Sequence, residues 1–262
     1  MKHIDNTLYY HYTTIPACHG ILSSRRIWLT DYRYLNDKNE IRQGLKDLFD
    51  RFDKEVAQAL ETAFYWHDHF AHQCILSLSK SPRILSQWRA YANDGTGVAI
   101  GFSKFFLSHA GLELVDCIYE NHENYIGELA EKYSAFARAV LDARKELRAE
   151  NTIMNWIREH EHDFNAVIRD VLPLKHPAFA EEQEVRALKS YRVGNVKQRL
   201  RGDLIVPYHE EVFWDEEEDG ASIYLAVREV WLGPKCNELN RDAISSYNLG
   251  LLRLERFDCG YV

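Results

Sequence analysis

The chain has 262 residues, of which 46% are hydrophobic and 13% aromatic, and its formal net charge at pH 7 is −8. This length and composition predict a folded protein with a substantial buried core and exclude a largely disordered chain. The negative charge gives no reason to expect general binding to duplex nucleic acid. The short basic stretches at residues 25–26 and 200–201 are more typical of solvated surface.

The sequence also carries signals about the compartment. The first ten residues lack the apolar core of a signal peptide, and no apolar run approaches the ~20 residues that cross a bilayer. The five cysteines are scattered without a CxxC pair, as expected for reduced thiols. We therefore expect a cytoplasmic protein with no membrane partner and no disulfide framework.

Short strands and helices alternate in the first half of the chain. Residues 8–13 and 26–30 have the composition of strands, and residues 15–23 have the spacing of a short helix. Residues 40–72 are expected to be mostly helical. In residues 74–79, Ser77 and Ser79 alternate with leucines as in a half-buried strand. A helix at 85–91, a glycine turn and a buried strand at 98–102 follow.

Residues 124–172 have helical periodicity throughout and are expected to form two antiparallel helices, as an insert or lid. Strands are expected at 203–207, 223–227, 230–232 and 251–257, with a helix at 240–247. The acidic tract 215–219 is typical of a solvated loop. The chain, residues 1–262, is therefore expected to be a single α+β domain with mixed or antiparallel sheets and flanking helices.

Residues 182–186 bring three charged side chains together. If they form a strand, Glu182, Glu184 and Arg186 point to one face and Val185 to the other. Such a face is either a solvent-facing edge held by ion pairs or the lining of a cleft.

Other motifs that would indicate a known chemistry are missing. His67, His69 and His72 lie at offsets of two and five, which do not share one face of a helix, so no metal site is expected there. The sequence contains no phosphate-binding loop of the Gly-Lys-Ser/Thr type, no GxGxxG and no Gly-x-Ser-x-Gly elbow. Nucleotide hydrolase, Rossmann and serine hydrolase functions therefore lack support.

An ordered set of segments resembles the bacterial domain-of-unknown-function family 2971. The set runs from residue 8 to about residue 235 and comprises residues 8–13, 27–30, 35–40, 74–79, 88–92 and 95–97, Lys175 with residues 182–186, and residues 230–234. The chain departs from the family pattern at Asn36-Asp-Lys-Asn-Glu40, where a proline is usual, and at Phe179, where a tryptophan is usual.

The layout of that family looks like the ADP-ribosyltransferase fold. The resemblance implies a first strand with His11, a middle strand with Ser77 or Ser79, and a late strand with Glu182 and Glu184. It also implies NAD as substrate, cleaved at the nicotinamide–ribose bond. This is an analogy at the level of the fold.

The implied chemistry gives each residue a role. Glu184 would stabilise an oxocarbenium-like cation, and Glu182 would act as general base toward an acceptor. His11 would position the adenosine side. Arg186 would either bind the diphosphate or simply hold the two glutamates in place. The candidates for substrate binding, through hydrogen bonds, stacking or charge, are Tyr12, Thr13, Asn36, Asp37, Ser77, Ser79, Trp88, Tyr91, Lys175 and Arg186. Each also has a purely structural interpretation, such as a helix cap or a core ring.

The first hypothesis is an enzyme similar to ADP-ribosyltransferases that uses NAD to modify an unknown intracellular macromolecule, as a toxin or phage-defence effector would. The alternative is a non-catalytic module that senses a nucleotide and contacts a protein partner. A third possibility is a nuclease or other hydrolase that uses Glu182 and Glu184 as a carboxylate pair.

Overall fold

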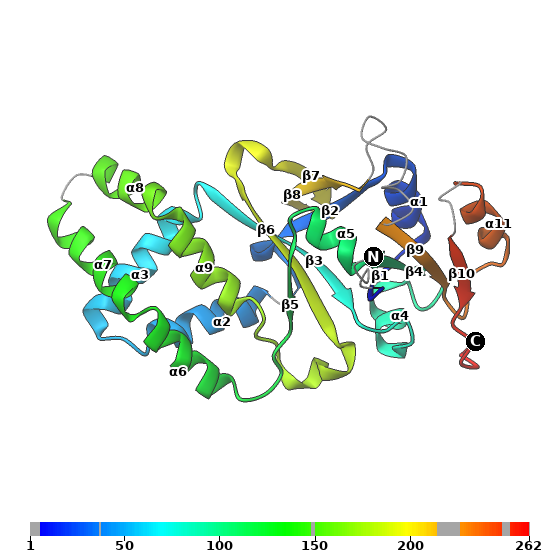
Figure 1. Cartoon of the computed structure of the whole chain (residues 1–262), viewed down its shortest axis with the longest axis horizontal. Coiled ribbons are helices and arrows are strands. Elements are labelled where there is room, and N and C mark those ends of the chain that lie inside the picture. The colour runs from blue at the N-terminus through cyan, green and yellow to red at the C-terminus, as the bar shows by residue number, and fades with distance from the viewer. Residues whose placement is uncertain (1–5, 37, 148–149, 214–225, 248–251, 262) are drawn as a thin grey trace, which may run out of the picture.

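A ten-stranded, mostly antiparallel sheet crosses the middle of the molecule, and helices gather at both of its ends (Figure 1). The computed structural model describes residues 6–36, 38–147, 150–213, 226–247 and 252–261. The arrangement confirms the expected α+β class. No helix in these described ranges is both long and apolar enough to span a bilayer.

The sheet has a main path and a branch. The main path runs in the order β10-β9-β4-β1-β3-β2-β8-β7, and β6 pairs with β3 and β5 off this path. Only β9 and β10 pair in parallel among the described strands. The strands are β1 (Leu8–Thr13), β2 (Arg26–Asp31), β3 (Ala71–Ser79), β4 (Val98–Ser103), β5 (Glu113–Asp116), β6 (Glu184–Arg192), β7 (Lys197–Arg201), β8 (Leu204–Val212), β9 (Val227–Leu232) and β10 (Arg253–Arg256).

The helices form two groups. One end of the molecule is a helical layer made of α2 (Lys38–Phe49), α3 (Lys54–His67), α6 (His122–Lys132), α7 (Ser134–Glu146), α8 (Glu150–Glu159) and α9 (Glu161–Val171) (Figure 1). The other helices lie along the rest of the sheet: α1 (Ile15–Ser24), α4 (Leu85–Tyr91), α5 (Lys104–His109) and α11 (Leu239–Ser245).

Several boundaries differ from the sequence-based expectation. The segment 124–172 forms four helices, α6 to α9, where two were expected. The helical stretch 40–72 is likewise divided into α2 and α3, and its last residues belong to β3. The edge strands β5 and β7 and the helix α5 were not predicted. The acidic tract 215–219 and residues 223–225 of an expected strand lie outside the described residues.

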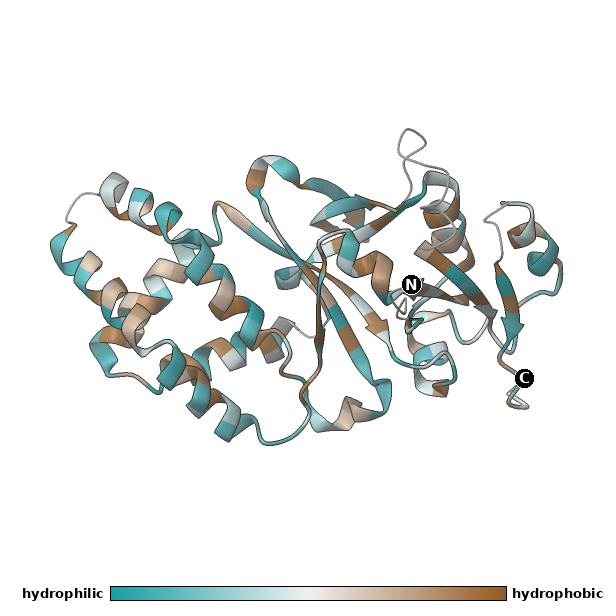
Figure 2. Ribbon diagram, viewed as in Figure 1, coloured by the Kyte–Doolittle hydropathy of each residue, from teal (hydrophilic) through white to brown (hydrophobic). Residues whose placement is uncertain are grey.

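The described residues form three clusters of buried hydrophobic side chains, of which two are large. One joins the helical layer to β3 and β6 through residues such as Phe64, Phe164 and Ile75. The other lies against the sheet and includes Leu76, Ile100 and Val185. Figure 2 shows hydrophobic residues, in brown, recurring along the helices and strands that supply these clusters. Because successive strand residues face opposite sides, β3 contributes Ile75 to one core and Leu76 to the other.

One ionisable side chain, His67 at the end of α3, is buried within the helical core. Its ring stacks on Phe164 at 5.2 Å between centroids and has 1% exposure. Burial lowers the pKa of His67 from 6.5 to about 4. The unfolded chain therefore binds a proton near pH 6.5 that the folded chain accepts only near pH 4. The stability contributed by the neutral ring is complete above pH 6.5 and is lost as pH falls toward 4.

We expect this ring to account for about 3 kcal/mol of the loss in unfolding free energy between pH 7 and pH 4. The variant His67→Phe should remove that share of the pH dependence, whereas His69→Gln, at an exposed position on the same turn, should keep it. Urea unfolding at several pH values measures both. An unchanged pH profile in His67→Phe would show that the ring does not titrate as described.

Candidate functional site

The candidate site lies where the sheet forks. Strand β3 pairs with β2 at Cys74 and Ile75 and with β1 at Ser79, and both partners lie on the same edge of β3. Between these pairings, at residues 76–78, that edge has no strand neighbour among the described residues. The strands β1 and β2 diverge here, and Ser77 is exposed in the resulting gap.

A cavity of about 330 Å³ occupies the fork. Most of the sequence-predicted site residues line it, and they come from β1, the segment after β2, β3, α4 and the segment 175–184. The predicted residues at the cavity are His11, Tyr12, Asn36, Ser77, Tyr91, Lys175, Glu182 and Glu184. The separated motifs of the sequence thus meet around one space.

A buried cluster of two carboxylates and two cations forms one wall of the cavity. Lys175 bridges the pair, donating to Oε2 of Glu182 and, at 2.6 Å, to Oε2 of Glu184. Arg186 donates to Glu184 from Nε and Nη2, both at 3.3 Å. Two positive and two negative groups therefore balance one another inside the protein.

The cluster fixes the charge of Glu184. The side chain is 5% exposed, and burial alone would raise its pKa, but Arg186 and Lys175 outweigh burial and lower the pKa to about 2. The same carboxylates raise the pKa of Lys175 despite its burial. Glu184 is therefore an ionised carboxylate at neutral pH, held in place by charged hydrogen bonds.

The two glutamates come from different elements. The sequence pattern predicted one strand through Glu182, Glu184 and Arg186, but β6 begins at Glu184 and Glu182 ends the 3₁₀ helix η2 (Pro177–Glu182). Gln183 between them has φ 47°, in the left-handed region. This turn directs Glu182 back toward Lys175, so both carboxylates still meet at the same ammonium group.

His11, on β1, also lines the cavity at the fork. Its Nδ1 lies 3.1 Å from the carbonyl oxygen of Ser77. A carbonyl can only accept, so Nδ1 carries the hydrogen of the neutral ring and Nε2 has a lone pair. Burial lowers the pKa of His11 more than the Ser77 carbonyl raises it. At neutral pH the ring is therefore an uncharged hydrogen-bond acceptor at the cavity.

Tyrosine side chains also line the cavity. The Tyr12 hydroxyl donates to the Ser81 carbonyl at 2.8 Å and accepts from the Ile84 amide at 3.2 Å. These bonds fix the loop that leads into α4, which carries Tyr91 at the cavity with 41% exposure. The Tyr10 hydroxyl instead donates to the buried carboxylate of Glu229.

Some predicted residues lie elsewhere. Ser79 is buried and donates to the Glu182 carbonyl at 2.8 Å, so it positions Glu182. Trp88 has 0% exposure, donates to the Pro82 carbonyl and stacks on Phe257, which makes it a core residue and not a stacking platform. Thr13 is buried in the pairing of β1 with β4. Asp37 lies outside the described residues.

Arg186 does not reach the cavity itself. It has 0% exposure, its Nη1 donates to the Leu172 carbonyl, and it supports Glu184 through two further bonds. These contacts match the second of its two expected roles, holding a glutamate in place, and not the direct binding of a diphosphate. The exposed Arg201, at the end of β7, lines the cavity instead and was not predicted. The other unpredicted lining residues are Tyr10, Leu35, Leu78, Gln87 and Phe179.

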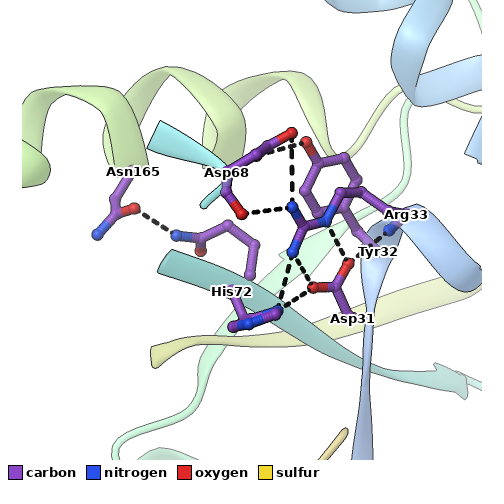
Figure 3. A network of polar contacts seen from close by, with 7 residues as sticks. Asp31, Tyr32, Arg33, Asp68, His72 and Asn165 are labelled. Carbon is purple, nitrogen blue, oxygen red and sulfur yellow. Dashed lines mark hydrogen bonds and ion pairs between the residues drawn. The ribbon is translucent and has the colours of Figure 1, made fainter. Parts of the chain in front are cut away.

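A second polar cluster holds the segment that delivers Leu35 and Asn36 to the cavity (Figure 3). Arg33 donates two hydrogen bonds to the buried carboxylate of Asp31, from Nε at 2.9 Å and from Nη2 at 2.6 Å. Its Nη1 donates to the Asp68 carbonyl at 2.7 Å. His72 also contacts Asp31, at 2.5 Å. Burial alone would raise the pKa of Asp31, but the bonds from Arg33 and His72 outweigh it and lower the pKa. The cluster is thus an anchor beside the site.

Comparison with known proteins agrees with part of this description. Residues 87–187 match the model of a family described as "Protein of unknown function (DUF2971)". This match supports the resemblance drawn from the ordered motifs. The matched segment contains Lys175, Glu182, Glu184 and Arg186, whereas His11 and Ser77 lie before it. The comparisons with curated proteins and with solved structures gave no match.

Proposed function

We propose that the fork cavity binds NAD and that the protein cleaves its nicotinamide–ribose bond, transferring ADP-ribose to a macromolecule. One observation carries the proposal: His11 on β1, Ser77 on β3 and the pair Glu182 and Glu184 line the same cavity. These are the three positions at which an ADP-ribosyltransferase-like layout places its ligand-binding and catalytic groups. A toxin or phage-defence role would be one use of such an activity.

The chemistry of the cavity suits this bond cleavage. Departure of nicotinamide leaves positive charge on the ribose ring, which an ionised carboxylate stabilises in a site that excludes water. Glu184 is such a carboxylate because its pKa is about 2. The lone pair of His11 Nε2 can accept a hydrogen bond from a ligand hydroxyl. Glu182, on the same ammonium group as Glu184, is placed to receive the proton of an incoming nucleophile.

The size of the cavity limits how the ligand would sit. About 330 Å³ is near the lower end of the ~300–1,000 Å³ typical of small-molecule sites. The nicotinamide riboside end fits this space better than the whole dinucleotide. The diphosphate would then lie at the mouth, where Arg201 replaces Arg186 as its expected partner.

The charge balance of the cluster favours a second candidate, a nucleotide sensor without turnover. Lys175 and Arg186 together neutralise Glu182 and Glu184. A carboxylate that is already paired with a cation stabilises a further positive charge less than an unpaired carboxylate does. In such a sensor, the same cavity would bind the nucleotide and the helical layer would contact a partner.

One experiment separates the candidates. Purified protein is mixed with NAD, free nicotinamide is measured by chromatography, and the unfolding midpoint is measured with NAD or with ADP-ribose. The enzyme is expected to release nicotinamide in proportion to protein concentration. The sensor would show a raised midpoint without release, because a ligand that binds only the folded state stabilises it. Neither release nor stabilisation would contradict both.

A further inference from the structure

A strip of basic and aromatic side chains runs from the cavity across β2, β8 and β7. We call it the Trp28 strip. It is made of Arg26, Trp28, Lys197, Arg199, Arg201, Tyr208 and Glu210. It is separate from the carboxylate cluster, and the NAD chemistry proposed above does not use Trp28, Arg199 or Lys197.

Strand register places the strip on the face of the sheet that carries Ser77. Thr30 pairs with Ile75 on β3 and with Tyr208 on β8, and Tyr208 pairs with Lys197 on β7. Directly paired residues share a face, and so do residues two apart along a strand. Trp28 therefore faces the same side as Ser77, and Arg199 and Arg201 face the same side as Lys197.

The centre of the strip is a stack that holds Trp28 at the surface. The rings of Trp28 and Tyr208 lie 4.8 Å apart, and the guanidinium of Arg199 lies 5.0 Å from the Trp28 ring. Arg199 is tied down by a 2.8 Å bond to the Thr30 hydroxyl. Tyr208 is only 7% exposed, whereas Trp28 keeps 44% exposure. The result is an indole held by two neighbours that still keeps nearly half of its surface exposed.

Positive charge surrounds this indole although the chain as a whole is negative. The strip holds four basic residues and one acidic residue, Glu210, which pairs with Lys197 at 2.6 Å and with Arg26 at 3.1 Å. Burial, together with the charge of the nearby Arg201, lowers the pKa of Arg199. Two neighbouring cations of this kind are stabilised by an anion placed between or above them.

Arg201 connects the strip to the cavity. It lines the cavity and donates to the Tyr34 carbonyl at 2.7 Å. An extended anionic ligand bound along the strip would therefore have one of its repeating units at the cavity, near Ser77 and Glu182. An exposed aromatic ring beside a row of basic side chains is typical of surfaces that bind a nucleic-acid strand, whose bases stack on the ring and whose phosphates contact the cations.

We propose that the Trp28 strip binds single-stranded nucleic acid, with a base stacked on Trp28 and the backbone phosphates along Lys197, Arg199 and Arg201. A single strand is favoured over a duplex because only unpaired bases offer a free ring face to the indole. An acidic peptide would use the same cations but would gain nothing from Trp28. A strand bound here is placed to serve as the macromolecular acceptor of the proposed transfer.

The test is a binding measurement without NAD, so that its result is independent of turnover. The full chain is titrated into a fluorescein-labelled oligothymidylate, its duplex with oligoadenylate, and a labelled polyglutamate, and anisotropy is followed. We expect the single strand to bind best, with a slope of log K against log salt of about −2 for three phosphate contacts. Trp28→Ala should weaken binding roughly tenfold, and Arg201→Ala should reduce the slope by about 0.7.

Matched variants in the helical layer serve as controls. Tyr65→Ala removes an aromatic ring of 61% exposure, and Arg144→Ala removes an exposed arginine. Both should bind as the unchanged protein does. Because Arg201→Ala removes an exposed side chain, it remains informative if Trp28→Ala lowers stability. Equal effects of strip and control variants, tighter binding of the duplex or of polyglutamate, or no binding of the single strand would overturn the proposal.

Discussion

Replacing Arg186 with methionine is expected to lower the free energy of unfolding by about 3 to 5 kcal/mol. Arg186 has 0% exposure and its guanidinium makes bonds to both oxygens of Glu184. Methionine fills much of the same volume but leaves the ionised carboxylate without this cation. Lys175 still compensates part of the charge, so the effect is expected at the lower end of that range.

A double variant shows whether charge is the cause. Arg186→Met combined with Glu184→Gln removes one charge of each sign and leaves Lys175 paired with Glu182. We expect the double variant to be more stable than Arg186→Met alone. The control Arg144→Met, at an exposed position of α7, should change little. Denaturant unfolding gives the free energy of unfolding of the unchanged protein and of the three variants. If Arg186→Met were as stable as the unchanged protein, the account of the cluster would be contradicted.

Replacing Glu184 with glutamine is expected to lower the rate of nicotinamide release by about 100-fold or more. The amide keeps the shape of the side chain and part of its hydrogen bonding but lacks the negative charge that would stabilise the ribose cation. Since the pKa of Glu184 is about 2, this charge is present throughout the neutral range. Initial rates at saturating NAD measure the effect directly.

The control for this variant is Glu113→Gln on β5. The Glu113 side chain is 54% exposed and pairs with Arg169 at 3.5 Å, and Glu113 is not among the residues that line the cavity. Its rate should equal that of the unchanged protein. If Glu184→Gln binds NAD and still releases nicotinamide at the unchanged rate, Glu184 does not stabilise the reacting sugar.

Local sequence patterns predicted many elements well. The strand Leu8–Thr13 and the helix Leu85–Tyr91 have the expected bounds. In both elements the pattern of buried and exposed residues can be read from the segment's own sequence. The division of 124–172 into four helices was missed because Tyr133 and His160 interrupt the backbone without interrupting the apolar periodicity. The edge strand Lys197–Arg201 was missed because its charged residues carry little strand signal.

The sequence indicated several residues of the candidate site but not its geometry. The order of His11, Ser77, Glu182 and Glu184 along the chain indicated which residues meet, and the fork between β1 and β2 brings them to one cavity. The alternation pattern could not show that Gln183 turns out of the strand. It also gave Arg186 the same face as Glu184 without revealing its complete burial or its bond to the carbonyl of Leu172, a residue distant in the sequence from the strand.

Calorimetric titration of NAD into the unchanged protein and into Ser77→Tyr tests most directly whether the fork is the ligand site. Ser77 is exposed in the cavity, so a tyrosine there should fill the space without disturbing the core. We predict saturable one-to-one binding to the unchanged protein and to Ser77→Ala, and loss of binding in Ser77→Tyr at an unchanged unfolding midpoint. Absence of binding to the unchanged protein, or equal binding to Ser77→Tyr, would contradict the proposed site.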